Sequence, residues 1–482
     1  MAKTIPVLLL LFFLAPAIKK TSAQNYHALD GSSFSGVNAL YNNPASTVNQ
    51  VYKWDVTVFG FQAAINNNAI VVNNNSLSIF DSSTIGLTNG LHPRHLQSSI
   101  DVNILNMRYR INPKNAVGIG FRLRSYNHLN MTAFAYDDTT STLQSFLHQN
   151  NSVNFLDGDA IHSGWAEVDA NYSRVIFKSS TSLLSAGITL SYLKCLSDAY
   201  ARVSHLNYSE LTLPNKNYYV INQAAATLEY SDNYLITNNN NSNTQNFHNF
   251  LSKAPSSAGF DIGAEYLIKN NAGDNTDDVS ATNYDWKIGL AVMDIGHNKF
   301  NPIEGSVSVN SPLDFTDSTF QNKINKVRNI KDLRDSLSSL FGGADSLQKP
   351  FTISRPTRLV LSVDHSLGNH FFINGQLSIN FFPARAGQKL HSHELNLLTV
   401  TPRWETRGWG IYLPVQYNAQ KQFWIGAAVK LGPVLLGVHN LNLLKWFKTG
   451  QQTYNGGGYI LLSVHPFNKP ARKPGNADCP VF

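Results

Sequence analysis

Apolar and polar residues alternate along much of the chain beyond residue 50. In residues 117–124, apolar side chains stand at every second position, with glycine or arginine between them. The same alternation recurs in residues 184–192, 260–266 and 373–381. Because successive side chains of a β-strand point to opposite faces, each segment predicts a strand with one apolar face and one polar or small face.

Alternation alone would also suit a soluble β-sandwich, but three features favour a membrane barrel. Many of the predicted strands exceed the usual five or six residues, and a membrane strand needs about 9–11. Connections alternate between short turns and long polar stretches, as in outer-membrane barrels. Tryptophans near strand ends match an interfacial aromatic girdle. These are Trp54, Trp165, Trp286, Trp404 and Trp409.

The pattern predicts an all-β fold, a transmembrane antiparallel β-barrel of about 14 strands. An even number of strands returns both chain ends to the periplasm. Connection 269–282 is long where a short turn is expected, so it is either a larger periplasmic loop or a sign that the count is off by one hairpin. The predicted strands are 52–65, 98–111, 116–128, 163–177, 182–196, 257–268, 283–297, 356–366, 370–382, 394–404, 408–417, 422–431, 434–440 and 457–466.

Two local irregularities accompany this pattern. The alternation changes phase within the first two predicted strands, which predicts a β-bulge in each. Residues 322–340 carry apolar side chains every three or four positions and end at Gly342, which predicts a helix in an extracellular loop. A lid over the barrel mouth and simple loop packing remain equal alternatives for this helix.

Composition fits an exported barrel. Only 14% of residues are charged and 11% are aromatic, and the mean hydropathy is −0.19. Residues 1–23 read as a cleaved signal peptide, with Lys3 followed by an apolar stretch too short to span a bilayer. Its removal takes away Lys3, Lys19 and Lys20 and no acid, which lowers the formal net charge of +7. The basic balance therefore predicts no nucleic-acid partner.

Charged residues on predicted inward faces are the main candidate site. Arg122 and Arg124 of one strand face Glu167 and Asp169 of the next. Opposite charges at matching positions of neighbouring strands pair across the ladder. A bulge in the second strand would add two further arginines to these predicted lumen charges. They are Arg108 and Arg110. We favour a network that braces the barrel interior over a permeation filter.

Catalytic and metal signals are weak. Ser191 to Lys194 match the spacing S-x-x-K but lie along a strand without companion motifs. The pair His391 and His393 and the pair His92 and His95 lack a third ligand nearby, and hydrated loop histidines are more usual. We therefore expect no enzyme activity, no catalytic residues, no metal and no cofactor.

A short motif ahead of the first strand resembles a known family. Residues 39–46 read Ala-Leu-Tyr-Asn-Asn-Pro-Ala-Ser, within a lead rich in glycine, serine and alanine. Asn43, Pro44 and Ala45 in this position resemble FadL-type outer-membrane transporters. Among their relatives, the chain looks most like uncharacterised Bacteroidetes barrels that are similar to the type IX secretion shuttle subunit. The resemblance implies a 14-stranded barrel plugged by an N-terminal hatch, with Asn43, Pro44 and Ala45 as hatch residues.

The resulting domain assignment has four parts. Residues 1–23 are the signal peptide, 24–50 the hatch, 51–467 the barrel and 468–482 a periplasmic tail. We expect an outer-membrane protein that contacts outer-membrane lipid. It would transport a small or hydrophobic solute, or assist secretion or envelope assembly together with other proteins. The alternative is a structural or surface-interaction protein. Polar inward positions depart from the apolar pocket of a FadL-type hydrophobic-ligand channel.

Overall fold

The computed structural model describes most of the chain from Tyr26 onward. The predicted signal peptide 1–23, the tail 468–482 and, apart from four isolated positions, the predicted helix 322–340 lie outside the described residues. The described ranges are 26–73, 84–140, 142–213, 216–231, 242–269, 279–300, 307–311, 332, 335–336, 339, 345–346, 350–382, 385–386, 389–394, 396–418, 421–444 and 454–466.

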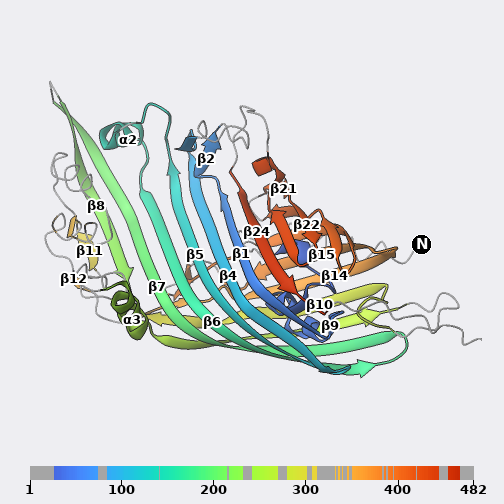
Figure 1. Cartoon of the computed structure of the whole chain (residues 1–482). Coiled ribbons are helices and arrows are strands. Elements are labelled where there is room, and N and C mark those ends of the chain that lie inside the picture. Colours follow the sequence, from blue (N-terminus) through green and yellow to red (C-terminus); the bar gives the residue numbers. More distant parts are fainter. Residues whose placement is uncertain are drawn as a thin grey trace, which may run out of the picture.

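Fourteen antiparallel strand positions close into one barrel, which confirms the predicted fold class and strand count (Figure 1). The last strand pairs with the first and so closes the cylinder. Two positions are each built from two short strands in line. Around the wall the strands are β1 (Trp54–Asn67), β4 (His92–Asn112), β5 (Asn115–Phe134), β6 (Leu156–Lys178), β7 (Ser182–Leu213), β9 (Ser256–Ile268), β10 (Trp286–Phe300), β14 (Arg358–Gly368), β15 (Phe371–Asn380), β18 (Leu397–Glu405), β19 (Trp409–Tyr412) with β20 (Val415–Asn418), β22 (Ala427–Leu431) with β21 (Phe423–Ile425), β23 (Val434–Val438) and β24 (Gly456–Val464).

The two faces of the wall differ as the alternation predicts. In β5 and β9, the exposed positions include Ile119, Phe121 and Ile262, whereas Arg122 and Asp261 are buried. Apolar side chains thus cover the outside of the cylinder and polar side chains fill its inside, the arrangement of a transmembrane barrel. No helix among the described residues is long and apolar enough to cross a membrane.

Replacing Ile262 with arginine tests this facing. The Ile262 side chain is 50% exposed on the middle of β9. Ile262→Arg is expected to lower the free energy of unfolding by about 2–4 kcal/mol in lipid vesicles, because a charge on the lipid face is destabilising. Ile262→Ala is the matched control. Both losses are measured by denaturant unfolding. If Ile262→Arg lowers the free energy of unfolding no more than Ile262→Ala does, this face lies in water.

Both predicted bulges are present. The register of β1 against β24 shifts between Thr57 and Phe59. The register of β4 against β5 shifts between Asn103 and Met107, and Leu105 there has a φ of 53°. Further register shifts occur that the alternation does not predict, and the one opposite Gly164 and Trp165 lies in β7, where Leu196 is the extra residue. Trp165 shares the inward face of β6 with Glu167 and Asp169, so it is fully buried instead of standing in the aromatic girdle, and its predicted placement is wrong.

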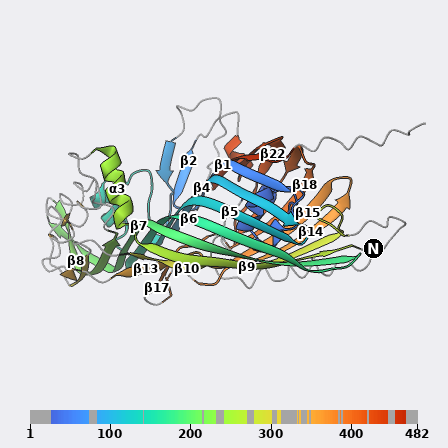
Figure 2. The ribbon, with the colours of Figure 1, turned by 60° about the horizontal axis from the view of Figure 1, so that its bottom comes forward.

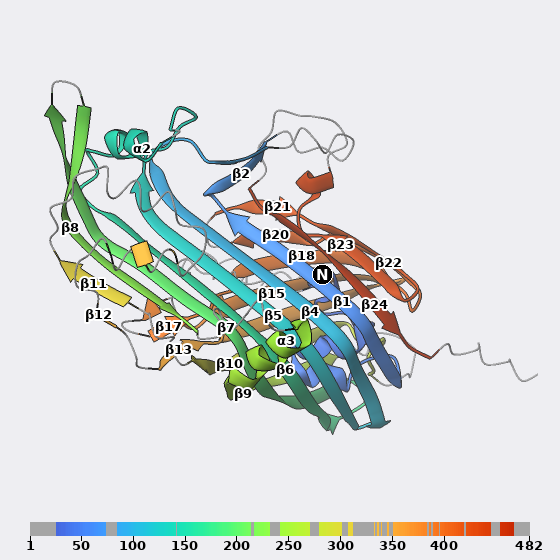
Figure 3. The ribbon, with the colours of Figure 1, turned by 60° about the vertical axis from the view of Figure 1, so that its left-hand side comes forward.

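Strands β4 to β7 run 20 to 32 residues, well beyond what a bilayer needs. Their upper parts fall in stretches we predicted as loops, because strands outside the membrane need no apolar face. Figure 3 shows the hairpin of β7 and β8 (Lys216–Tyr230) projecting from this end. Further elements of the long connections are β2 (Ile70–Asn73), β3 (Thr84–Leu87), α2 (Leu143–Gln149), β8 (Lys216–Tyr230), α3 (Asn243–Lys253), β11 (Val307–Ser311), β12 (Asp345–Ser346), β13 (Phe351–Ser354), β16 (Arg385–Ala386), β17 (Lys389–His391) and the 3-10 turn η7 (Leu441–Leu444).

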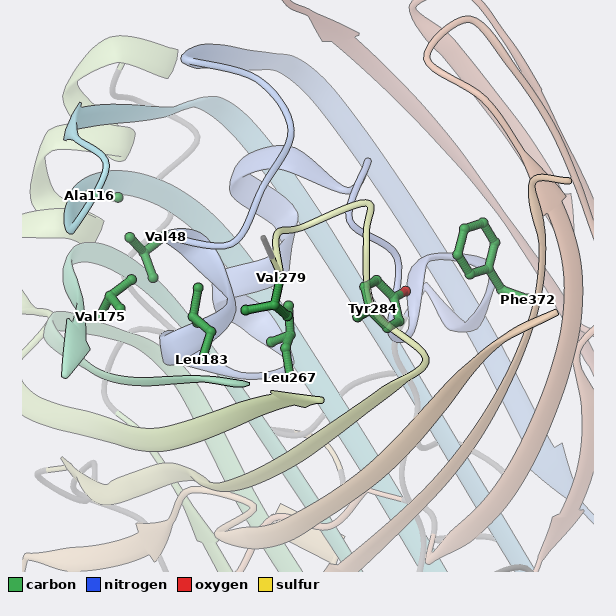
Figure 4. Packing of buried hydrophobic residues seen from close by; sticks show 8 residues of the cluster. All are labelled: Val48, Ala116, Val175, Leu183, Leu267, Val279, Tyr284 and Phe372. Atoms are coloured by element: carbon green, nitrogen blue, oxygen red, sulfur yellow. The ribbon is translucent and has the colours of Figure 1, made fainter. Parts of the chain in front are cut away.

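The short-turn end carries an apolar cluster (Figure 4). Val175, Leu183 and Leu267 meet there at the ends of β6, β7 and β9. Val279 and Tyr284 of the β9–β10 connection pack on the same cluster. Since β9 and β10 pair directly, as Figure 2 shows, the connection 269–282 joins two neighbouring strands of the wall, and the hairpin count is right.

Candidate functional site

The N-terminal segment lies inside the barrel near the short turns. We call its described part, residues 26–50, the hatch. It consists of three 3-10 turns, η2 (His27–Leu29), η3 (Gly36–Tyr41) and η4 (Pro44–Thr47), and most of its residues are buried. Figure 1 shows it enclosed by the strands. Because the hatch forms no sheet with the wall, it is held by side-chain contacts and by its fit inside the barrel.

Asn43, Pro44 and Ala45 rest on a flat part of the wall. The Asn43 side chain accepts a bond from the backbone N–H of Ala45 (3.0 Å) and donates one to the carbonyl of Ala264 on β9 (2.9 Å). Beneath them, Gly187 of β7 pairs with Gly263 of β9. A Cβ at either glycine would lie closer than 3.0 Å to atoms of Asn43 or Pro44. The wall therefore lacks side chains where the hatch sits.

The C-terminal part of the hatch hydrogen-bonds polar side chains of β6, β7 and β9. Thr47 donates to Asn171 (2.7 Å) and lies 2.6 Å from the Ser173 hydroxyl. Asn49 donates to Glu265 (2.7 Å), which also accepts from Ser46. These are polar contacts between small side chains. Water can replace each neutral bond at a net cost of about 0.5–1.5 kcal/mol, and each bond to the Glu265 carboxylate at about 1.5–3 kcal/mol.

Two buried arginines fix the hatch at its ends. Arg403 of β18 pairs with Asp364 (2.6 Å) and Glu405 (2.8 Å), and donates to the hatch carbonyl of Gly31 (3.2 Å). Arg108 of β4 pairs with Asp55 (2.7 Å) and donates to the carbonyl of Thr47 (3.1 Å). Both hold the hatch through backbone oxygens.

A second layer of charge lies above the hatch. We call it the lumen charge network. In it Arg122 pairs with Glu167, and Arg124 bridges Asp101 (3.0 Å) and Glu394 (2.8 Å) while also pairing with Asp294. All of these groups are buried. Its members are Arg122, Arg124, Arg355, Arg358, Asp101, Glu167, Asp169, Asp294 and Glu394.

The predicted lumen charges therefore divide into three groups. Arg122, Arg124, Glu167 and Asp169 meet in the lumen charge network. Arg108 lies below it, beside the hatch. Arg110 joins neither the network nor Asp55, and it reaches only the carbonyl of Gln50 at 3.3 Å. Arg110 stands at the rim, four residues nearer the turn than the bulge.

The connection between β15 and β18 supplies an unexpected part of the site. Residues 389–394, which we call the inward segment, turn into the lumen and reach the opposite wall. The carbonyl of His393 accepts from Gln97 of β4 (2.5 Å), and Glu394 pairs with Arg124 of β5 and Arg358 of β14 (both 2.8 Å). His391 and His393 are buried here, so our view of them as hydrated loop residues is wrong.

Sequence reasoning missed five members of the network. Asp101 and Asp294 stand in predicted strands, and Asp101 lies on the polar face between Ile100 and Val102, so alternation could have found it. Arg355 and Arg358 sit where β13 bends into β14. Glu394 comes from a loop, and no local pattern signals that this loop turns inward.

Trp165 belongs with the network. Its indole N–H donates to Glu167 (2.9 Å), and its ring stacks on Tyr126 with centroids 5.4 Å apart. Among the described residues no group of three histidine, cysteine, aspartate or glutamate side chains has the arrangement of a metal site. The layer is a dense set of ion pairs. Such a set can hold the wall and the inward segment in one geometry.

Comparison with known proteins gives a family and several solved barrels. The Ralstonia pickettii toluene transporter TbuX is 10% identical over 89% of this chain and 94% of that one, with a TM-score of 0.39. The P. putida toluene transporter TodX is 9% identical over 92% and 94%, with a TM-score of 0.37. A Pseudomonas aeruginosa FadL homologue is 10% identical over 92% and 99%, with a TM-score of 0.37. No curated protein matches. A family model described as a family of unknown function, DUF5723, matches residues 44–438, and the chain belongs to that family.

Proposed function

We propose that the protein is an outer-membrane transporter of a small solute whose lumen is closed twice in series. The hatch closes the short-turn end. The inward segment, held in place by the lumen charge network, closes the middle. The protein would act without enzymatic chemistry and without a cofactor, and its outer surface would contact lipid alone.

The polar seat of the hatch is the observation that carries this proposal. A plug meant to stay would be expected to bury apolar surface, which is the main favourable term in protein packing. The hatch does bury apolar side chains, Tyr26 and Ala28 among them, against the wall. Its C-terminal part is different, because there Thr47, Asn49 and Ser46 meet polar side chains of the wall, namely Asn171, Ser173 and Glu265. Water can replace hydrogen bonds of this kind, so they favour a plug that can move.

Another role is favoured by a different observation. The extended strands and the β7–β8 hairpin form a broad projecting sheet at the long-loop end (Figure 3). A surface-interaction protein would use such a projection to meet a partner. The resemblance to the type IX secretion shuttle subunit fits a partner from secretion or envelope assembly. In this alternative the closed lumen need never open.

Conductance in planar bilayers separates the two roles. Two changes are made singly and together: deletion of residues 26–50, and replacement of residues 389–393 by a five-residue Gly-Ser linker. The linker leaves Glu394 in place for Arg124. We expect little conductance from either single variant and steady conductance from the double variant, because closures in series must both be removed.

A folded double variant that conducts nothing would exclude the transport role and favour the interaction role. Resistance of the barrel to denaturant shows that each variant is folded. A five-residue Gly-Ser replacement in the half-buried connection 135–140, between β5 and α2, controls for loop engineering as such.

A further inference from the structure

An apolar groove lies on the outer face of the wall, across β6, β7, β9 and β10. Its volume is about 560 Å³, within the roughly 300–1,000 Å³ of small-molecule sites. The exposed side chains of Tyr172, Ile188 and Ile262 stand along it. Because these side chains are on the face that meets lipid, the groove opens into the bilayer and not into the lumen.

The register of the strands explains why the wall is hollowed here. Ala186 of β7 pairs with Ala264 of β9, and both point outward. The next outward pairs on either side carry larger side chains: Ile188 with Ile262 toward the long loops, and Leu184 with Tyr266 toward the short turns. Two methyl groups between two rows of large side chains leave a depression.

Arg174 of β6 is the only charged residue in the lining of this groove. It pairs with Ala186, so its side chain points outward beside the alanines. The side chain is exposed, and it forms no ion pair or hydrogen bond with the part of the chain that the structure describes. A cation on the lipid face of a barrel is destabilising unless it lies near the membrane surface or is neutralised. We therefore expect its partner to come from the membrane.

The position of Arg174 matches the depth of lipid headgroups. It pairs with Asn115, the first residue of β5. The backbone N–H of Val175, the next residue, donates to the carbonyl of Lys114 in the β4–β5 turn (2.8 Å). Lys114 is exposed as well. Short turns of a barrel stand at the membrane boundary. Two basic residues therefore meet the apolar groove where headgroups begin.

We propose that this groove binds one anionic phospholipid of the leaflet on the short-turn side. The lipid phosphate pairs with Arg174, Lys114 adds to the attraction, and an acyl chain lies over Ala186 and Ala264. Arginine suits phosphate because its planar fork donates two hydrogen bonds. A second copy of the chain fits less well, because a symmetric contact through this groove would bring two Arg174 side chains together.

The test is native mass spectrometry of the delipidated full-length protein, titrated with lipid in detergent. The probes are phosphatidylglycerol and phosphatidylcholine with the same acyl chains, because the choline cation neutralises the phosphate of the second lipid. We expect one phosphatidylglycerol per chain to bind about fivefold tighter than phosphatidylcholine, the worth of one basic residue at an anionic lipid surface.

Two variants separate the headgroup contact from the groove. Arg174→Gln should weaken phosphatidylglycerol binding about fivefold and bring it close to that of phosphatidylcholine. Arg407→Gln is the control, because Arg407 is an exposed arginine in the β18–β19 turn, outside the lining. Ala186→Leu should weaken both lipids about fourfold, the worth of one methylene group displaced from the groove. Ala170→Leu is its control, because it adds the same bulk at an exposed position of β6 outside the lining.

Two results would overturn the proposal. One is equal affinity for the two lipids, or phosphatidylglycerol binding that is no weaker in Arg174→Gln than in Arg407→Gln. The other is a dimer of the lipid-free protein that Ala186→Leu dissociates and Ala170→Leu does not, because a second copy would then fill the groove. Either result leaves the transport proposal intact, since the groove lies outside the lumen.

Discussion

Leucine at Gly263 is expected to dislodge the hatch. A Cβ there already lies closer than 3.0 Å to Asn43, and a leucine side chain would extend further into the hatch. Overpacking of this kind costs about 1–3 kcal/mol, and each 1.4 kcal/mol is about tenfold in a population. The displaced fraction of hatch should therefore rise about ten- to a hundredfold. Gly187→Val should act in the same direction, since Gly187 lies under Pro44.

Hatch displacement is read from the accessibility of a reporter cysteine. Thr47→Cys places a thiol on a fully buried hatch position, in a background with Cys195→Ala and Cys479→Ser. The rate of labelling by a membrane-impermeant maleimide should rise with Gly263→Leu. Ala264→Val is the control, because Ala264 is the next residue and points to the outer face. Equal labelling rates in the folded Gly263→Leu and Ala264→Val variants would contradict this prediction. They would show that the strands of the wall shift to accommodate the leucine while the hatch stays in place.

Loss of Arg124 is expected to cost about 3–5 kcal/mol of unfolding free energy. Its guanidinium forms ion pairs with Asp101, Asp294 and Glu394 and is almost fully buried. Arg124→Met leaves these carboxylates without their shared cation, which is the costly way to break a buried ion pair. Denaturant unfolding in vesicles, followed by tryptophan fluorescence, measures the loss.

Two further variants make this result specific. Arg110→Met should cost far less, under about 1 kcal/mol, because Arg110 makes one long hydrogen bond and no ion pair among the described contacts. Adding Asp101→Asn and Glu394→Gln to Arg124→Met should restore part of the lost stability, since neutral amides no longer need the cation. A cost for Arg124→Met no larger than for Arg110→Met would mean that the network does not brace the barrel.

Much of the barrel could be predicted because strand facing is a local property. Residues such as Arg122 and Ile119 stand on opposite faces whatever surrounds them, and the lipid selects which face is apolar. The bulge near Leu105 was visible for the same reason, as a change of phase. Trp165 shows the limit. It stands two residues before the inward-facing Glu167, so the same period of two places it inside, and an assignment to the girdle from its residue type alone is wrong.

The partners of the inward charges could not be predicted in full. Arg122 and Glu167 occupy matching positions of neighbouring strands, so their pairing follows from register. Glu394 meets Arg124 across the lumen, 270 residues away in sequence. That pairing depends on how a loop folds into a closed cylinder. The hatch contacts likewise combine residues of the N-terminal segment with distant strands, as where Asn49 meets Glu265 of β9.

The amino-acid sequence by itself determined the number of strands, which of their faces meets lipid, and the presence of a segment ahead of the barrel that resembles a hatch. Those features arise from the period of two and from short motifs. Only the tertiary structure decided that the inward segment crosses the lumen and that Gly187 and Gly263 form the seat of Asn43 and Pro44. Closing a sheet brings distant residues together, and no local pattern records which ones will meet.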